Sequence, residues 1–174
     1  ILIVAGYLDK GGKGVIQASL DAGSFKTFFL PDGMIGDSLP TAIGDDLNGS
    51  IGTVPGTDSP GATKFNEIAK SNNFKAGPYT KESYDSAALI MLAMQAANST
   101  NSNDFKSKVM DVANAPGEKI FPGELAKGLK LLSEGKEIDY VGASAVELIG
   151  GGESAGNFAE ILIDNQKVTT VGYK

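Results

Sequence analysis

The chain lacks three residue types on which much of protein chemistry depends. It contains no cysteine, no histidine and no arginine, so that all 15 basic residues are lysine. Without histidine or cysteine, it cannot form a Ser-His-Asp triad, a cysteine nucleophile, a histidine-built zinc site or an iron–sulfur cluster. These absences exclude the commonest hydrolase and metalloenzyme sites. We expect no catalytic residues, no metal site and no cofactor.

Positive charge is also scarce. The 21 acidic and 15 basic residues give a formal net charge of −6. Nucleic-acid-binding surfaces need basic side chains to neutralise phosphates, and they commonly use arginine to contact bases. Nucleic acid is therefore not an expected partner, and an anionic membrane surface is disfavoured for the same reason. A hydrophobic content of 41% with 21% charged residues is typical of a globular protein.

Long hydrophobic runs are missing as well. The longest apolar stretch lies around residues 87–97 and is interrupted by Gln95. A membrane-spanning helix needs ~20 consecutive apolar residues, so this stretch is too short. Its composition instead predicts a long helix over residues 81–97 that is apolar nearly all round and therefore buried.

The first third of the chain alternates between two kinds of segment. Apolar runs at residues 1–5, 27–30 and 50–54 predict strands, and the segments 12–22 and 37–43 predict helices. Strands separated by helices at this spacing imply right-handed crossovers and a parallel sheet, which makes the fold class α/β. Residues 1–5 are expected to form a central strand, covered on both faces. A central strand at the very start indicates the later part of a longer protein.

The remainder of the chain has a different pattern. Residues 55–60 contain two prolines and a glycine and predict a linker, after which the chain becomes mostly helical. A helix is expected to start at Ser59-Pro60. Residues 138–142 are expected to be a compact, turn-rich segment. The apolar runs 159–163 and 168–171 predict a hairpin around Asp164-Asn165-Gln166.

The Gly-rich segment after the first strand does not fit a phosphate-binding loop. If Gly6 and Gly11 are its frame glycines, the loop requires lysine where Gly12 stands. The residue after Lys13 is Gly14, where serine or threonine is needed to bind magnesium. A Gly-rich turn from strand to helix is the better interpretation.

Three side chains are candidates for a binding site. Tyr7 follows the first predicted strand and Asp32 follows the second, so both should lie at the carboxyl edge of the sheet, where α/β proteins bind ligands. An aromatic ring and a carboxylate suit a ligand that carries an ammonium group. Alternatively, Asp32 only shapes a Pro-Asp-Gly turn. Tyr84, near the start of the long helix, is a third candidate, or a boundary aromatic residue of the core.

A series of motifs then connects the chain to a known family. They are Gly6-Tyr7 after the first strand, Gln17-Ala18 and Gly23 in the first helix, Asp32-Gly33, Asn48-Gly49, Val54-Pro55, Ser83-Tyr84-Asp85, and the segment 135–144 with the sequence GKEIDYVGAS. In order and spacing, they resemble the later half of a type I periplasmic binding protein of the Leu/Ile/Val-binding family, the substrate receptors of ABC importers. The resemblance extends over nearly all 174 residues.

The resemblance implies two Rossmann-like lobes with a ligand held in the cleft between them. Residues 1–54 would be part of the C-terminal lobe and residues 55–157 part of the N-terminal lobe. Residues 158–174 would return to the C-terminal lobe. The fold would be incomplete on its N-terminal side, and the missing N-terminal half of the same protein would accompany this part. On these residues alone, the sheet would expose apolar surface.

The resemblance also assigns roles to the candidate residues. The family's ligand-contacting aromatic residue falls on Tyr7, and the acidic residue that holds the ligand's amino group falls on Asp32. A further contact falls on Tyr84. The residues that bind the ligand carboxylate belong to the missing half. Some members have glutamate where this chain has Asp32, which leaves the ligand identity open.

The function implied by the resemblance is capture of a small amino acid, branched-chain or similar, by hinge closure. The receptor would be periplasmic or otherwise extracytoplasmic, exported by a signal peptide of its precursor, and would present its ligand to an ABC permease in the membrane. The alternative is a sensory or regulatory module of the same fold that binds an amide or another small polar ligand. An enzyme would have to use Asp, Tyr, Lys or Ser, and no catalytic pair of these is evident.

Overall fold

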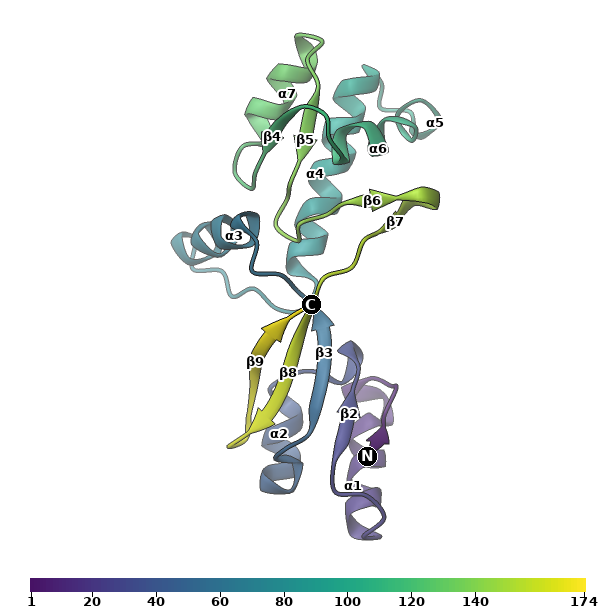
Figure 1. The fold of residues 1–174 in the computed structure, drawn as a ribbon, viewed down its shortest axis with the longest axis vertical. Helices are drawn as coiled ribbons and strands as arrows, with labels where there is room; N and C mark the ends of the chain where they lie inside the picture. The colour runs from purple at the N-terminus through teal and green to yellow at the C-terminus, as the bar shows by residue number, and fades with distance from the viewer. The chain divides into compact units, whose positions relative to one another are not determined.

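A computed structural model describes residues 1–174, and the chain divides into two compact units. Unit 1 consists of Ile1–Gly56 together with Phe158–Lys174, and unit 2 consists of Thr57–Asn157. The fold is mixed α/β, with parallel strands in both units (Figure 1). No helix is both long enough and apolar enough to cross a membrane.

Unit 1 is built on a five-stranded sheet. Its strands, in spatial order, are β1 (Leu2–Ile3), β2 (Phe28–Leu30), β3 (Ile51–Pro55), β8 (Phe158–Asp164) and β9 (Lys167–Tyr173). The first three are parallel, as the alternating pattern predicts, and β8 and β9 are antiparallel to their neighbours.

The hairpin of β8 and β9 was also predicted from the sequence. Its two turn residues, Asn165 and Gln166, have φ values of 49° and 58°. Positive φ at both positions is the geometry of a tight two-residue turn that matches the twist of the strands.

Helices cover one face of this sheet. Helix α1 (Lys13–Asp21) contributes Ile16 and helix α2 (Ser38–Ile43) contributes Leu39 to a core that also contains Phe28 and other strand residues. Three short helical turns complete the connections: η1 (Leu8–Gly12), η2 (Asp32–Met34) and η3 (Gly44–Leu47).

The opposite face of the sheet carries a row of apolar side chains. Ile3 is opposite Phe29, Phe29 is opposite Ile51, and Ile51 is opposite Leu162. Ile3 is 66% exposed and Ile51 is 40% exposed. Strand β1 is the first in the sheet order, so within residues 1–174 the prediction of a central strand covered on both faces is wrong. The apolar surface expected for these residues alone is present.

Unit 2 is mostly helical. Its helices are α3 (Pro60–Ser71), α4 (Thr80–Ala97), α5 (Ser102–Phe105), α6 (Lys108–Ala113) and α7 (Leu125–Ser133). Its strands are β4 (Glu118–Ile120), β5 (Ile138–Tyr140), β6 (Leu148–Ile149) and β7 (Glu153–Ser154), with the short turn η4 (Gly150–Gly152) between the last two. Strands β4 and β5 pair in parallel, and β6 and β7 pair antiparallel.

Helix α3 begins where the sequence predicts. The Ser59 side chain accepts a hydrogen bond from the Ala62 N–H at 3.2 Å, and Pro60 occupies the first helical position. The hydroxyl satisfies one of the N–H groups that every helix start leaves unpaired, and proline has no N–H to satisfy there.

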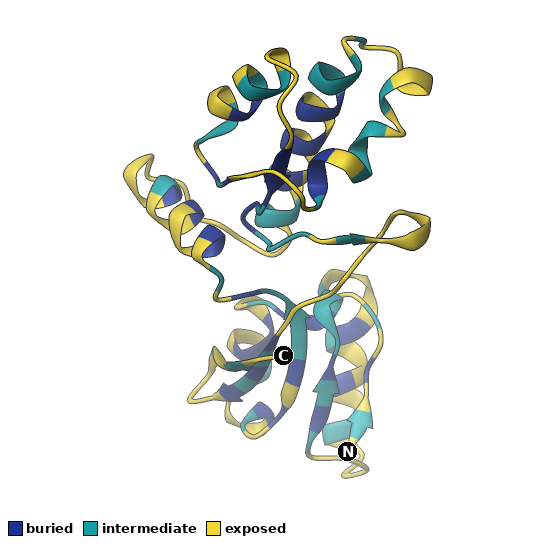
Figure 2. Cartoon of the chain, turned by 45° about the horizontal axis from the view of Figure 1, so that its top comes forward, coloured by how far each residue is buried: buried dark blue, intermediate teal, exposed yellow.

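Helix α4 forms as predicted but is not buried all round. Ala88, Leu89 and Leu92 lie in the core of unit 2, whereas Ile90 and Met91 are more than 40% exposed. Buried and exposed residues accordingly alternate along the helices of this unit (Figure 2). The prediction of a turn-rich segment at 138–142 is also wrong in its first part, because residues 138–140 form the buried strand β5.

Candidate functional site

Tyr7 and Asp32 lie at the carboxyl ends of neighbouring strands. Tyr7 follows β1 and Asp32 begins η2, directly after β2. The Tyr7 backbone oxygen accepts hydrogen bonds from the Lys10 and Gly12 N–H groups at 3.2 and 3.1 Å, which fixes the turn that leads into α1. The Tyr7 ring is 69% exposed, whereas Asp32 is half-buried. The sequence argument therefore predicted their shared edge of the sheet.

The segment that follows β1 and the segment that follows β2 meet at Gly33. A Cβ atom added to Gly33 would lie 2.5 Å from the Gly6 carbonyl oxygen and 3.0 Å from Cδ1 of the Tyr7 ring. The absence of a side chain at this position therefore lets the Tyr7 ring lie directly over the residue that follows Asp32. The structure brings these two candidates together.

The Asp32 carboxylate also has a local partner. Its Oδ1 accepts a hydrogen bond from the Gly33 N–H at 2.7 Å. This bond is what an aspartate that shapes a turn would make. The turn-shaping role of Asp32 is therefore observed, and its ligand-binding role stays a prediction.

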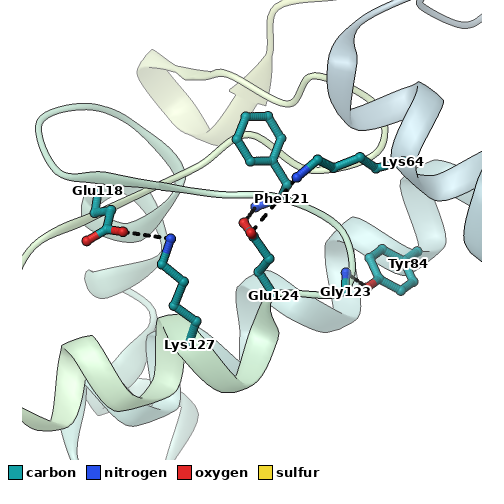
Figure 3. A network of polar contacts seen from close by, with 7 residues as sticks. All are labelled: Lys64, Tyr84, Glu118, Phe121, Gly123, Glu124 and Lys127. Atoms are coloured by element: carbon teal, nitrogen blue, oxygen red, sulfur yellow. Dashed lines mark hydrogen bonds and ion pairs between the residues drawn. The ribbon is translucent and has the colours of Figure 1, made fainter.

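Tyr84 belongs to unit 2, not to the unit of Tyr7 and Asp32. Its ring packs edge-on against Phe65, with the ring centroids 5.2 Å apart. Its hydroxyl oxygen accepts a hydrogen bond from the Gly123 N–H at 2.9 Å (Figure 3). The ring also borders an apolar hollow of about 290 Å³ that is lined by Phe65, Ile68 and Phe74 among others. A ligand contact by Tyr84 stays a prediction.

A network of polar contacts surrounds the segment after β4 (Figure 3). The Phe121 N–H donates to Glu124 Oε2 at 3.0 Å, and Lys64 lies 4.5 Å from the centre of the Phe121 ring and 3.9 Å from Glu124 Oε1. Lys127 pairs with Glu118 at 2.6 Å, and this hydrogen bond raises the pKa of Lys127. These contacts connect α3, β4 and α7.

The residue that the sequence argument missed is Asp85. It is 2% exposed. Its carboxylate accepts hydrogen bonds from the Tyr140 hydroxyl at 2.9 Å and from the Ala143 N–H at 2.7 Å. The Ser144 N–H and hydroxyl donate to it at 2.7 and 2.6 Å. A signal was available, because Asp85 lies three and four residues before Ala88 and Leu89 on the buried face of α4, where a carboxylate needs partners.

Tyr140 is held neutral in this cluster. Its side chain is 1% exposed, and burial, together with the nearby Asp85 charge and the hydrogen bond to it, raises the pKa of the Tyr140 phenol well above its usual range. In the unfolded chain a tyrosine ionises near pH ~10. Above that pH the unfolded state loses a proton that the folded state keeps, so the free energy of unfolding falls as pH rises.

We expect this fall in the free energy of unfolding to be measurable in unit 2. Above pH ~10, the wild-type free energy of unfolding should fall by about 1.4 kcal/mol per pH unit more steeply than that of Tyr140→Phe, which has no phenol to ionise. Urea titrations between pH 9 and 11.5 test this difference. Lysines also titrate in this range, but they contribute equally to both pH profiles because both proteins contain them. Parallel pH profiles for the two proteins would contradict the prediction.

Tyr79 is a second residue that the sequence did not single out. It precedes α4 with φ 62° and ψ 6°, and its side chain is 44% exposed. A left-handed conformation costs a non-glycine residue about 1–2 kcal/mol. Residues in such conformations persist only where the surrounding structure holds them, and they are enriched at functional sites. Backbone strain at one residue has no compositional signature, so no sequence argument could have found it.

No group of three or more acidic side chains is placed to hold a metal ion. The two candidate side chains at the edge of Tyr7 and Asp32 offer one phenol and one carboxylate. Such a set suits a small organic cation, since the ring covers apolar atoms while the carboxylate accepts hydrogen bonds from an ammonium group.

No protein-family model matches the sequence. The chain is 28% identical over 97 residues to the chemotactic signal transduction system substrate-binding protein BasB of Halobacterium salinarum. The alignment covers 56% of this chain and 24% of BasB.

Two solved structures share the fold. The leucine-binding protein LivK from Thermotoga maritima matches with a TM-score of 0.71 and 16% identity, over 98% of this chain and 43% of LivK. The branched-chain amino acid transporter substrate-binding protein LivJ from Streptococcus pneumoniae, solved with isoleucine, matches with a TM-score of 0.66 and 14% identity, over 99% of this chain and 43% of LivJ. The chain spans less than half the length of each of these proteins.

Proposed function

Because the chain has the fold of part of a type I periplasmic binding protein, we propose that it is part of an extracytoplasmic receptor that captures a small amino acid or a related amide. Unit 1 would be part of the C-terminal lobe and unit 2 part of the N-terminal lobe. Capture by hinge closure is part of this proposal. The proposed activity is binding without catalysis.

The observation that carries the proposal is the placement of Tyr7 beside Asp32. Both follow parallel strands, at the sheet edge where α/β proteins bind ligands, and the Tyr7 ring lies over Gly33. In the proposed complex the Asp32 carboxylate accepts hydrogen bonds from the ammonium group of the ligand, and the Tyr7 ring covers its apolar atoms. A hydrogen bond to a charged group contributes about 1.5–3 kcal/mol, which corresponds to roughly 10- to 150-fold in affinity.

The first experiment identifies the ligand class. Thermal unfolding of the protein should be followed with each of the standard amino acids and a set of small amides in turn. A ligand that binds only the folded state raises the midpoint temperature, and the stabilisation grows with the logarithm of its concentration relative to its Kd. If no amino acid or amide shifts the transition, the proposal is wrong.

We expect Asp32→Ala to weaken amino-acid binding at least ~10-fold, because the ligand ammonium loses its charged partner. Calorimetric titration with the amino acid that gives the largest thermal shift measures the effect. Asp21→Ala is the matched control, because Asp21 is an exposed carboxylate of α1 that contacts Gln17 and should leave the Kd unchanged. An Asp32→Ala protein that binds with wild-type affinity would remove Asp32 from the site.

The similarity to BasB favours a second candidate function, in which the receptor passes ligand binding to a signalling partner. The two functions differ in what the receptor serves, an ABC permease or a chemotaxis system. Cells that lack this protein separate them. Loss of uptake of a radiolabelled ligand with normal chemotaxis supports the transport role, and the reverse result supports the sensory role.

A further inference from the structure

The second turn of α4 is tied to both loops that follow the parallel strands of unit 2. The Tyr84 hydroxyl binds the backbone of Gly123, just after β4. The neighbouring Asp85 binds the backbone of Ala143 and Ser144, just after β5. Two consecutive residues of one helix therefore fix both loops at the carboxyl edge of β4 and β5, which is the edge at which α/β proteins hold ligands.

The loop after β5 is packed as closely as its backbone allows. A Cβ atom added to Gly142 would lie 2.6 Å from Asp85 Oδ2, and one added to Gly61 would lie against the Gly142 carbonyl oxygen. Ala143 is fully buried and packs with Phe65 and Tyr84. The loop is thus enclosed between the N-terminal halves of α3 and α4, and the Asp85 carboxylate is the polar group that holds it there.

The hydrogen bonds of Asp85 depend on its being a carboxylate. The Asp85 carboxylate is buried, and its four hydrogen bonds come from neutral donors, two backbone N–H groups and two hydroxyls. Burying a charge without an opposite charge carries a desolvation penalty of several kcal/mol. The carboxylate nevertheless suits this position, because its two oxygens accept hydrogen bonds from all four donors at once. An amide of the same shape has one oxygen and would point its NH₂ group at donors.

We propose that Asp85 is a positioning residue for ligand binding, which holds residues 141–144 in the binding-competent conformation of this edge. This inference rests on the proposed function. Asp85 acts through the loop and does not itself touch the ligand. When a loop leaves its competent conformation for part of the time, the apparent Kd rises by the inverse of the competent fraction.

The test compares Asp85→Asn with a control that loosens a different loop. Asn114 binds both the N–H and the carbonyl oxygen of Leu148, at 2.9 and 2.7 Å, and so anchors the start of β6 by side-chain hydrogen bonds. Asn114→Ala should destabilise unit 2 without changing the edge of β4 and β5. The probe is an equimolar mixture of the standard amino acids, titrated into each protein at a temperature where circular dichroism shows it to be folded.

We expect the apparent Kd to rise about 10-fold or more for Asp85→Asn, which corresponds to a loop that is binding-competent about a tenth of the time. For Asn114→Ala, we expect the apparent Kd to stay within about twofold of wild type. Hydrogen exchange at the Ala143 and Ser144 amides should accelerate in Asp85→Asn only. Wild-type affinity in Asp85→Asn, or an equal loss in Asn114→Ala, overturns the inference but leaves the proposed function intact. Absence of binding by the wild type overturns the proposed function itself.

A second variant covers the case in which Asp85→Asn does not fold. Ser144→Ala removes only the hydroxyl that donates to Asp85 Oδ2 and keeps the other three hydrogen bonds. Its apparent Kd should rise about threefold, because the competent fraction falls less. An unchanged Kd for Ser144→Ala, with accelerated exchange at its own amide, would show that the loop conformation does not matter for binding.

Discussion

Replacing Phe28 with alanine is expected to lower the free energy of unfolding of unit 1 by about 3–5 kcal/mol. The Phe28 side chain is fully buried in β2, and it packs in the core with Leu30 and Ile161. Truncation removes its apolar surface from the core and leaves a cavity that the surrounding strands can only partly fill. Small domains have a total stability of about 5–15 kcal/mol, so the loss is a large part of it.

Urea titration followed by circular dichroism measures this effect. Phe25→Ala is the matched control, because Phe25 precedes the same strand but is 41% exposed. Substitutions at exposed positions usually change stability by about 0.5 kcal/mol or less. Similar losses for the two variants would contradict the assignment of Phe28 to the core and of Phe25 to the surface.

Replacing Gly142 with alanine is expected to lower the free energy of unfolding of unit 2 by about 2–5 kcal/mol. Gly142 has φ 66°, a left-handed conformation that costs a residue with a side chain about 1–2 kcal/mol. Its new Cβ atom would also lie 2.6 Å from Asp85 Oδ2, and overpacking of this kind costs about 1–3 kcal/mol. The carboxylate would have to move, and its hydrogen bonds to Ala143 and Ser144 would lengthen or break.

Gly135 separates the two contributions. It has φ 73°, and a Cβ atom added there meets nothing within 4 Å. Gly135→Ala should therefore cost only the backbone strain of about 1–2 kcal/mol. If both variants lose the same stability in urea titrations, the close approach of Asp85 to the loop is absent in solution.

The parts of the fold that sequence reasoning predicted correctly are those with a repeated local signal. The apolar runs at residues 27–30 and 50–54 predict strands, and β2 and β3 lie within a residue of them. Strand β4 gives no such signal, because two of its three residues are the exposed Glu118 and Lys119. It exists because it pairs in parallel with β5. Pairing between distant segments leaves no trace in the composition of either one.

In the candidate site, too, some features could be predicted from the sequence and others could not. The shared edge for Tyr7 and Asp32 follows from strand order and direction, which the alternating pattern already implies. The role of Asp85 depends on donors that lie 55 to 59 residues further along the chain. The buried face of α4 indicates that Asp85 needs partners, but only the folded chain shows which residues supply them.

The pairing of β3 with β8 has a consequence for how the chain is assembled. Pro55 and Phe158 are opposite each other in this antiparallel pair, and the chain leaves unit 1 after Gly56 and re-enters it at Phe158. Residues 57–157 are therefore an insertion at the open end of a β-hairpin. Paired strands lie about 5 Å apart, so a turn of two residues is enough to close the hairpin without the insertion. Both covalent connections to residues 57–157 therefore start beside a single residue pair of the sheet, Pro55 and Phe158, and this pair holds the ends of both connections.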